Sequence, residues 1–186
     1  VDISDKDLCM SPDDLIKKIN KKTKVVIYTQ MNGRVGQIDY IKKICRQKKL
    51  FLIEDAAHAI GSYNNKTHVG NSGIASSFSF SMPKLITMGQ GGAVITNNSK
   101  LARRLRLYKN FGRKKSGEDI HKYIGYNFKI TDMQSILGLE QLKSVNLRMK
   151  KKKIAVSGGL RTNDEQIEAS LNKKCFLYIL SIEMGF

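Results

Sequence analysis

The segment FLIEDAAHAIGSYNNKTHVGNSGIASSFSFSMPKLITMGQGGAVIT, residues 51–96, combines the clearest strand patterns of the chain with its densest group of reactive side chains. The apolar run 50–53 is followed at once by Glu54 and Asp55, which is typical of a buried parallel strand that ends at a polar site. Open α/β sheets bind their ligands at this edge, beyond the carboxyl ends of the strands. Asp55 is therefore the first candidate site residue.

A second predicted strand, 75–80, leads into a loop that carries one lysine between a proline and several glycines. A lysine amine that forms a Schiff base with a cofactor aldehyde must be partly desolvated so that it can lose its proton. A pyridine-based cofactor that acts as an electron sink also needs a carboxylate beside its ring nitrogen. Lys84 and Asp55 are the candidates for these two roles. Taken singly, a loop lysine more often marks solvated surface, and an aspartate after a strand more often caps a helix.

The residues before this segment predict a β-α-β unit. Ser11 and the following Pro-Asp-Asp are typical of a helix start, with a cap, a proline at the first helical position and acidic residues in the first turn. The β-branched run 25–28 predicts a buried strand. A helix follows, whose buried face is predicted to hold Ile38, Ile41, Ile44 and Cys45. We assign this unit a scaffold role.

The composition is that of a globular protein with an unusual charge. The 186 residues are 41% hydrophobic and 26% charged, with a net charge of +17. Such a charge also occurs in nucleic-acid-binding proteins. The lysines, however, are spread along the chain without an interleaved aromatic platform, so we expect no nucleic-acid partner. No run is long and apolar enough to span a bilayer, and the three cysteines form no metal-binding pattern. We therefore expect no membrane association, no metal and a cytoplasmic location.

Two helices are predicted in the second half, over 99–107 and from Thr131 onward. The second has a strong helical period, and its apolar side chains are expected to be buried on one face. These side chains are Met133, Ile136, Leu137, Leu139 and Leu142. His68, in contrast, is predicted to lie at the surface.

Four strings of sequence carry a resemblance to a known family: EDAAHAIGS, HVGNSGIASSFSF, PKLITMGQGGAVITN and GYNFKITDMQSILGLEQLK. Together they resemble the DegT/StrS-type nucleotide-sugar aminotransferases, which depend on pyridoxal phosphate and have fold type I. The resemblance covers residues 1–155 and implies part of the large cofactor-binding domain, an α/β fold with a mostly parallel sheet and helices on both faces. Residues 156–186 are interpreted as a divergent tail. The family's N-terminal segment and C-terminal small domain are expected to be missing.

The resemblance implies roles for five side chains. Lys84 is the expected catalytic Schiff-base lysine, and Asp55 is expected to contact the pyridine nitrogen. His58 is expected beside the cofactor ring near its phenolic oxygen, and Ser79 at the phosphate. Asn127 is expected to reach across a homodimer interface to the phosphate of the neighbouring subunit's cofactor.

The implied function is transfer of an amino group, with glutamate as donor, to a nucleotide-linked keto-deoxysugar such as a perosamine precursor. The product would serve the synthesis of surface polysaccharide such as O-antigen. A lysine at position 84, where dehydrating relatives have histidine, points to transamination. Two alternatives remain open: an inactive fragment that keeps the fold, and a basic nucleic-acid-binding protein.

Overall fold

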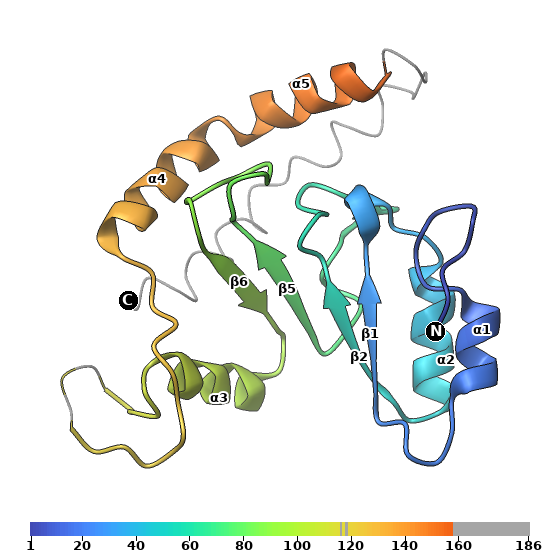
Figure 1. Cartoon of the computed structure of the whole chain (residues 1–186), viewed down its shortest axis with the longest axis horizontal. Helices are drawn as coiled ribbons and strands as arrows, with labels where there is room; N and C mark the ends of the chain where they lie inside the picture. Colours follow the sequence, from blue (N-terminus) through green and yellow to red (C-terminus); the bar gives the residue numbers. More distant parts are fainter. Residues whose placement is uncertain (116, 118, 158–186) are drawn as a thin grey trace.

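The computed structural model of the chain describes residues 1–115, 117 and 119–157. The divergent tail predicted over 156–186 lies outside these residues, except for its first two positions. The elements, drawn in Figure 1, are α1 (Pro12–Lys18), β1 (Val25–Thr29), a 3-10 turn η1 (Met31–Gly33), α2 (Ile38–Gln47), β2 (Phe51–Asp55), β3 (Tyr63–Asn64), β4 (Thr67–His68), β5 (Ala75–Ser79), β6 (Gly92–Ile95), α3 (Ser99–Lys109), α4 (Asp132–Lys143) and α5 (Val145–Ser157). None of the helices in the described ranges is long and apolar enough to cross a membrane.

A four-stranded sheet with the order β1-β2-β5-β6 forms the centre of the molecule. β1, β2 and β5 are parallel, with Asp55 opposite Thr29 on one side and opposite Ser77 on the other. β6 is antiparallel to β5 because the chain turns back through the loop 80–91. This mostly parallel α/β sheet confirms the predicted fold class. A small separate hairpin, β3-β4, was not predicted.

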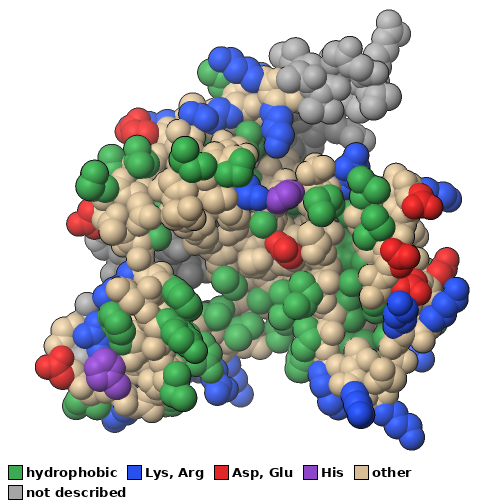
Figure 2. All heavy atoms as spheres, viewed as in Figure 1, with side chains coloured by type: hydrophobic (Ala, Val, Ile, Leu, Met, Phe, Trp, Pro, Cys, Tyr) green, Lys and Arg blue, Asp and Glu red, His purple; other side chains and the backbone are tan. Residues whose placement is uncertain are grey.

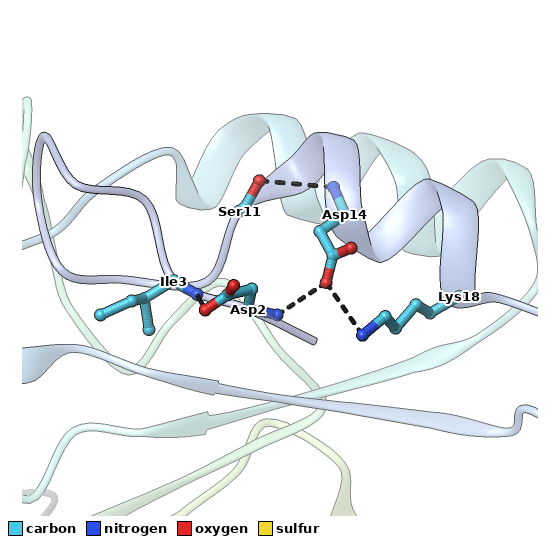
Figure 3. Close-up of polar contacts among 5 residues, drawn as sticks. All are labelled: Asp2, Ile3, Ser11, Asp14 and Lys18. Carbon is cyan, nitrogen blue, oxygen red and sulfur yellow. Dashed lines mark hydrogen bonds and ion pairs between the residues drawn. The ribbon is translucent and has the colours of Figure 1, made fainter.

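The first helix begins at the residue that the sequence predicts. Ser11 Oγ accepts a hydrogen bond from Asp14 N at 3.3 Å, and Pro12 occupies the first helical position. The Asp14 carboxylate also accepts a hydrogen bond from Asp2 N at 2.7 Å and lies 3.5 Å from Lys18 Nζ (Figure 3). The hydrogen bond from Asp2 lowers the pKa of Asp14. These contacts attach the first residues of the chain to α1.

One face of β1 and β2 packs against α1 and α2. The buried side chains of α2 are the four predicted from its period, Ile38, Ile41, Ile44 and Cys45. They form one cluster with Val26, Tyr28 and Leu52 from the strands. Burial raises the pKa of the Cys45 thiol, so this cysteine behaves as a small apolar core residue.

The opposite face of the sheet is open in the described part of the chain. Val25, Ile27 and Phe51 alternate with the buried strand residues and are 43%, 58% and 58% exposed. Figure 2 shows hydrophobic side chains gathered over the strands in the middle of the view. On β1 and β2, α1 and α2 thus cover one face, and these exposed side chains lie on the other. Monomeric proteins rarely leave such a contiguous apolar patch in water, which marks this face as a contact surface.

α4 forms where a helix is predicted, but the prediction that its apolar side chains are buried on one face is wrong for most of them. Its one buried position is Gly138, where an added Cβ would lie 3.0 Å from Met88 side-chain atoms. Met133, Ile136 and Leu137 are 78%, 61% and 53% exposed. Leu142 is partly buried and packs against the cluster that contains Phe80 and Met88. The apolar side chains of α4 are spread around the helix rather than gathered on one side, so the helix has no apolar face to bury.

Candidate active site

Three of the polar side chains at the carboxyl edge of the sheet share its open face. Asp55 is the last residue of β2, and Ser79 is the last residue of β5. Because Asp55 is opposite Ser77 and side chains alternate along a strand, Asp55, Ser77 and Ser79 lie on the same face. All three are partly buried. This is the edge at which an open α/β sheet binds its ligand.

Asp55 is fixed by its backbone and by one of its two carboxylate oxygens. Its carbonyl accepts a hydrogen bond from Gln30 N at 3.0 Å, and Oδ1 accepts one from Ala57 N at 3.1 Å. No residue within the described ranges donates a hydrogen bond to Oδ2. That oxygen is available to a ligand donor such as a protonated ring nitrogen, so Asp55 fits the role that the resemblance implies for it.

Lys84 lies in the turn that follows β5. Ser79 Oγ accepts a hydrogen bond from Ser81 N at 3.3 Å, and the Ser81 carbonyl accepts one from Lys84 N at 3.0 Å. These two bonds tie the backbone of the lysine to the end of the strand that carries Ser79. The Lys84 side chain is partly buried, and none of the described residues forms a hydrogen bond or ion pair with its amine. Within these ranges the amine therefore has no protein partner that a ligand would need to displace.

The loop that carries Lys84 is closed by backbone contacts, as its glycines predict. Phe80 N donates to the Gly91 carbonyl and Met88 N donates to the Phe80 carbonyl, both at 2.9 Å. Gly89 has φ +76, a conformation that L side chains rarely adopt, and a Cβ on Gly92 would lie 2.8 Å from the Phe78 carbonyl. The loop is thus a compact turn rather than an extended connection.

Ser79, which is predicted to bind the cofactor phosphate, forms hydrogen bonds within the chain. Its Oγ lies 3.1 Å from Ser81 Oγ in addition to the bond from the Ser81 backbone. A bound phosphate would therefore compete with Ser81 for this hydroxyl. The role of Ser79 stays a prediction.

His58 and Asn127 lie in different parts of the molecule. His58 is exposed in the turn that follows β2, three residues beyond Asp55 and at the same edge of the sheet. Asn127 pairs with Asn110, just past the end of α3. In Figure 1 this segment lies beside α3 at the bottom of the sheet, whereas the loop between β5 and β6 lies at the top. Four of the five predicted side chains thus share one edge, and Asn127 is remote from them.

Sequence reasoning missed the most densely bonded side chain near the site. Glu54 is fully buried, and its carboxylate accepts hydrogen bonds from the Gln30 side chain and from three backbone N–H groups in residues 70–73. The available signal was the alternation of side chains along β2. Glu54 lies on the same face of the strand as the buried Leu52, whereas Asp55 lies on the other face.

The prediction that His68 lies at the surface is wrong. The residue is 6% exposed and lies in the β3-β4 hairpin. Nδ1 lies 2.6 Å from the Val69 carbonyl, and Nε2 accepts a hydrogen bond from Gly61 N at 3.1 Å. This pair of contacts assigns the neutral form with the proton on Nδ1. Burial lowers the pKa of His68, outweighing the opposing effects of the Val69 carbonyl and the Glu54 charge.

Comparisons with known proteins agree with this architecture. The chain is 37% identical over 143 residues to a UDP-4-amino-4,6-dideoxy-N-acetyl-beta-L-altrosamine transaminase of Helicobacter pylori, a match that covers 76% of this chain and 38% of that protein. It is 35% identical over 152 residues to a GDP-perosamine synthase of Vibrio cholerae, covering 82% and 41%. The chain thus spans about two fifths of the length of these curated relatives.

Solved structures give the same result. Helicobacter pylori PseC, an aminotransferase involved in the biosynthesis of pseudoaminic acid, superposes with a TM-score of 0.77 at 31% identity, over 88% of this chain and 45% of that one. NtdA from Bacillus subtilis with bound cofactor PMP superposes with a TM-score of 0.71 at 27% identity, over 79% and 33%. The profile of one family matches residues 1–171, which is 16 residues beyond the predicted end of the resemblance at position 155. The chain therefore belongs to the DegT/DnrJ/EryC1/StrS aminotransferase family.

Proposed function

We propose that this chain carries the cofactor-binding part of a pyridoxal-phosphate-dependent sugar aminotransferase. The observation that carries the proposal is the placement of a lysine and a carboxylate at the same edge of the sheet, each with an atom left for a ligand. For Lys84 that atom is the amine nitrogen, and for Asp55 it is Oδ2. Family membership and a relative solved with PMP support the same cofactor chemistry.

The two residues have complementary tasks in this proposal. Pyridoxal phosphate, when bound, supplies an electron sink that stabilises negative charge developing on the carbon next to the amino group. Asp55 keeps the ring nitrogen protonated by accepting its hydrogen bond. Lys84 would hold the cofactor aldehyde until the amino donor displaces it. Its freed Nζ would then take the proton from the donor carbon as a base and deliver it to the cofactor carbon as an acid. Ser79 is assigned to bind the cofactor phosphate, and His58 is assigned to contact the cofactor ring.

The proposed acceptor is a nucleotide-linked keto-deoxysugar, and the proposed amino donor is glutamate. The GDP-perosamine synthase and the altrosamine transaminase among the relatives support a sugar acceptor that carries a nucleotide. Synthesis of surface polysaccharide is the proposed use of the product. The net charge of +17 also favours anionic substrates through long-range attraction.

A homodimer completes the proposal, with Asn127 acting on the cofactor phosphate of the neighbouring subunit. Within one chain Asn127 and Lys84 lie at different ends of the sheet, so Asn127 serves a site only if a second copy presents it. The exposed apolar side chains of α4, including Met133 and Ile136, support a contact between copies.

The proposed function is tested by locating the cofactor chemically. The chain is incubated with pyridoxal phosphate, dialysed and reduced with borohydride, and the adduct is located by peptide mass spectrometry. We expect label on Lys84 and loss of the label in Lys84→Ala, whereas Lys66→Ala, a control at an exposed lysine, keeps it. Label at another lysine would refute the site assignment. Loss of all label on dialysis would instead favour the inactive fragment.

A basic nucleic-acid-binding protein would give a different result in the same experiment. Its association with RNA or DNA would weaken steeply with salt, because binding releases counterions from the phosphates. Pyridoxal phosphate would leave no specific adduct in such a protein. Measuring both properties on one preparation separates the two functions.

A further inference from the structure

We infer that Glu54 is a positioning residue that holds Asp55 in place for the cofactor ring nitrogen. The inference rests on the proposed function, because it assigns a supporting residue to the same site. Glu54 and Asp55 are neighbours at the end of β2, and their side chains leave the strand on opposite faces. Glu54 anchors the strand end in the interior, while Asp55 presents its carboxylate at the open face.

The Glu54 carboxylate is fully hydrogen-bonded inside the protein. Oε2 accepts hydrogen bonds from Gln30 Nε2 at 3.0 Å and from Gly70 N at 2.9 Å. Oε1 accepts hydrogen bonds from Ser72 N at 2.6 Å and from Gly73 N at 2.8 Å. Each oxygen therefore has two donors, as a buried carboxylate requires. An amide cannot replace it, because its nitrogen would face two N–H groups.

The turn that supplies three of these donors is shaped to reach the strand. Gly70 has φ +93, a conformation that favours glycine. A Cβ on Gly73 would lie 2.5 Å from the Leu52 carbonyl, so only glycine permits this approach of the turn to β2. The backbone of the turn is thus fitted closely around the carboxylate of Glu54.

Gln30 connects this buried cluster directly to Asp55. Its backbone N donates to the Asp55 carbonyl at 3.0 Å, while its side-chain Nε2 donates to Glu54. One residue thus holds both members of the pair. Gln30 is only 1% exposed, and within the described residues its Oε1 has no hydrogen-bond partner. The amide is oriented by its bond to Glu54 even though its oxygen then stays unpaired.

The hydrogen-bonded cluster around Glu54 lies at the end of β2, where Asp55 would otherwise be loosely held. Asp55 is paired with Thr29 at the last position of the β1-β2 ladder, and strand ends are where pairing loosens first. Loosening would release the Asp55 carbonyl from Gln30 and let the carboxylate rotate. The Glu54 cluster opposes this motion from the inner face, without contact with the cofactor.

The test is a double-mutant cycle on cofactor affinity, measured by the absorbance of bound pyridoxal phosphate. We expect Glu54→Gln to raise the dissociation constant of the cofactor about tenfold and Asp55→Asn to raise it more. If Glu54 acts through Asp55, the double variant binds the cofactor no more weakly than Asp55→Asn alone. A matched core variant away from the cluster, Ile44→Val, is expected to leave the affinity unchanged.

A second readout does not depend on the cofactor. Hydrogen exchange of the amides of Gly70, Ser72 and Gly73 should accelerate in Glu54→Gln relative to Ile44→Val. If Glu54→Gln does not fold, Gln30→Met takes its place in the cycle, because it removes the Nε2 donor and keeps a similar size. Its expected effect on affinity is a smaller rise, about threefold, again absent in the Asp55→Asn background.

The outcomes distinguish a failure of the proposed function from a failure of the positioning role of Glu54. If the wild-type chain takes up no cofactor, the proposed function fails and this inference fails with it. If the chain binds the cofactor but the losses from Glu54→Gln and Asp55→Asn add, Glu54 acts only on general stability, and the positioning role is refuted.

Discussion

The buried histidine of the β3-β4 hairpin makes the stability of this protein dependent on pH. His68 is neutral in the fold because Nε2 accepts the Gly61 N–H and Nδ1 donates to the Val69 carbonyl. A proton on Nε2 would break the first bond and place a charge in a buried position. We therefore predict that His68→Gln removes a specific loss of stability that the wild-type chain suffers in mild acid.

The sign and size of the effect follow from linkage. The pKa of His68 is lowered from its ordinary value of 6.5, first by burial. Below that value the unfolded chain binds the proton and the folded chain does not, so stability falls as pH falls. The limiting slope is about 1.4 kcal/mol per pH unit. From pH 7.5 to 5.5 the loss due to His68 is at most about 1.4 kcal/mol.

The measurement is urea unfolding of the cofactor-free chain between pH 7.5 and 5.5. His68→Gln should be less stable than wild type at pH 7.5, because hydrogen bonds to the ring are lost, yet it should lose less further stability on acidification. His58→Gln removes an exposed histidine and should keep the wild-type pH dependence. Parallel curves for the wild type and His68→Gln would show that His68 is not the group that titrates.

Two further predictions concern packing and assembly. In urea unfolding, Gly36→Ala should lower the free energy of unfolding by about 2–4 kcal/mol, because Gly36 has φ +56 and a Cβ there would lie 2.3 Å from Tyr28 Oη. The control Gly117→Ala, at φ +85 with open space around the Cβ, should lower it by no more than about 1–2 kcal/mol. Ile136→Gln, at a position 61% exposed on α4, should change the unfolding free energy by less than about 0.5 kcal/mol but weaken self-association in sedimentation velocity. Equal costs for the two glycines, or unchanged self-association, would contradict these predictions.

The local elements could be predicted from sequence because their signals are local. The period of α2 identifies all four of its buried side chains, and Ser11 caps α1 as its residue type predicts. The apolar runs locate β1, β2 and β5, and polar residues at their ends locate the candidate site. The strings around Asp55 and Lys84 also identify the family, and the profile match confirms it.

The environment of each face and of each polar side chain was decided only by the tertiary structure. Alternation in β2 places Glu54 and Asp55 on opposite faces, but it does not reveal that backbone N–H groups 16 to 19 residues away surround Glu54. The same holds for His68, whose burial depends on an unpredicted hairpin, and for α4, most of whose apolar side chains stay exposed. Period and residue type depend on neighbours along the chain, whereas burial and hydrogen bonding depend on which distant segments meet. For that reason the sequence determined the elements and the family, and the tertiary structure decided which polar groups are anchored and which remain available to a ligand.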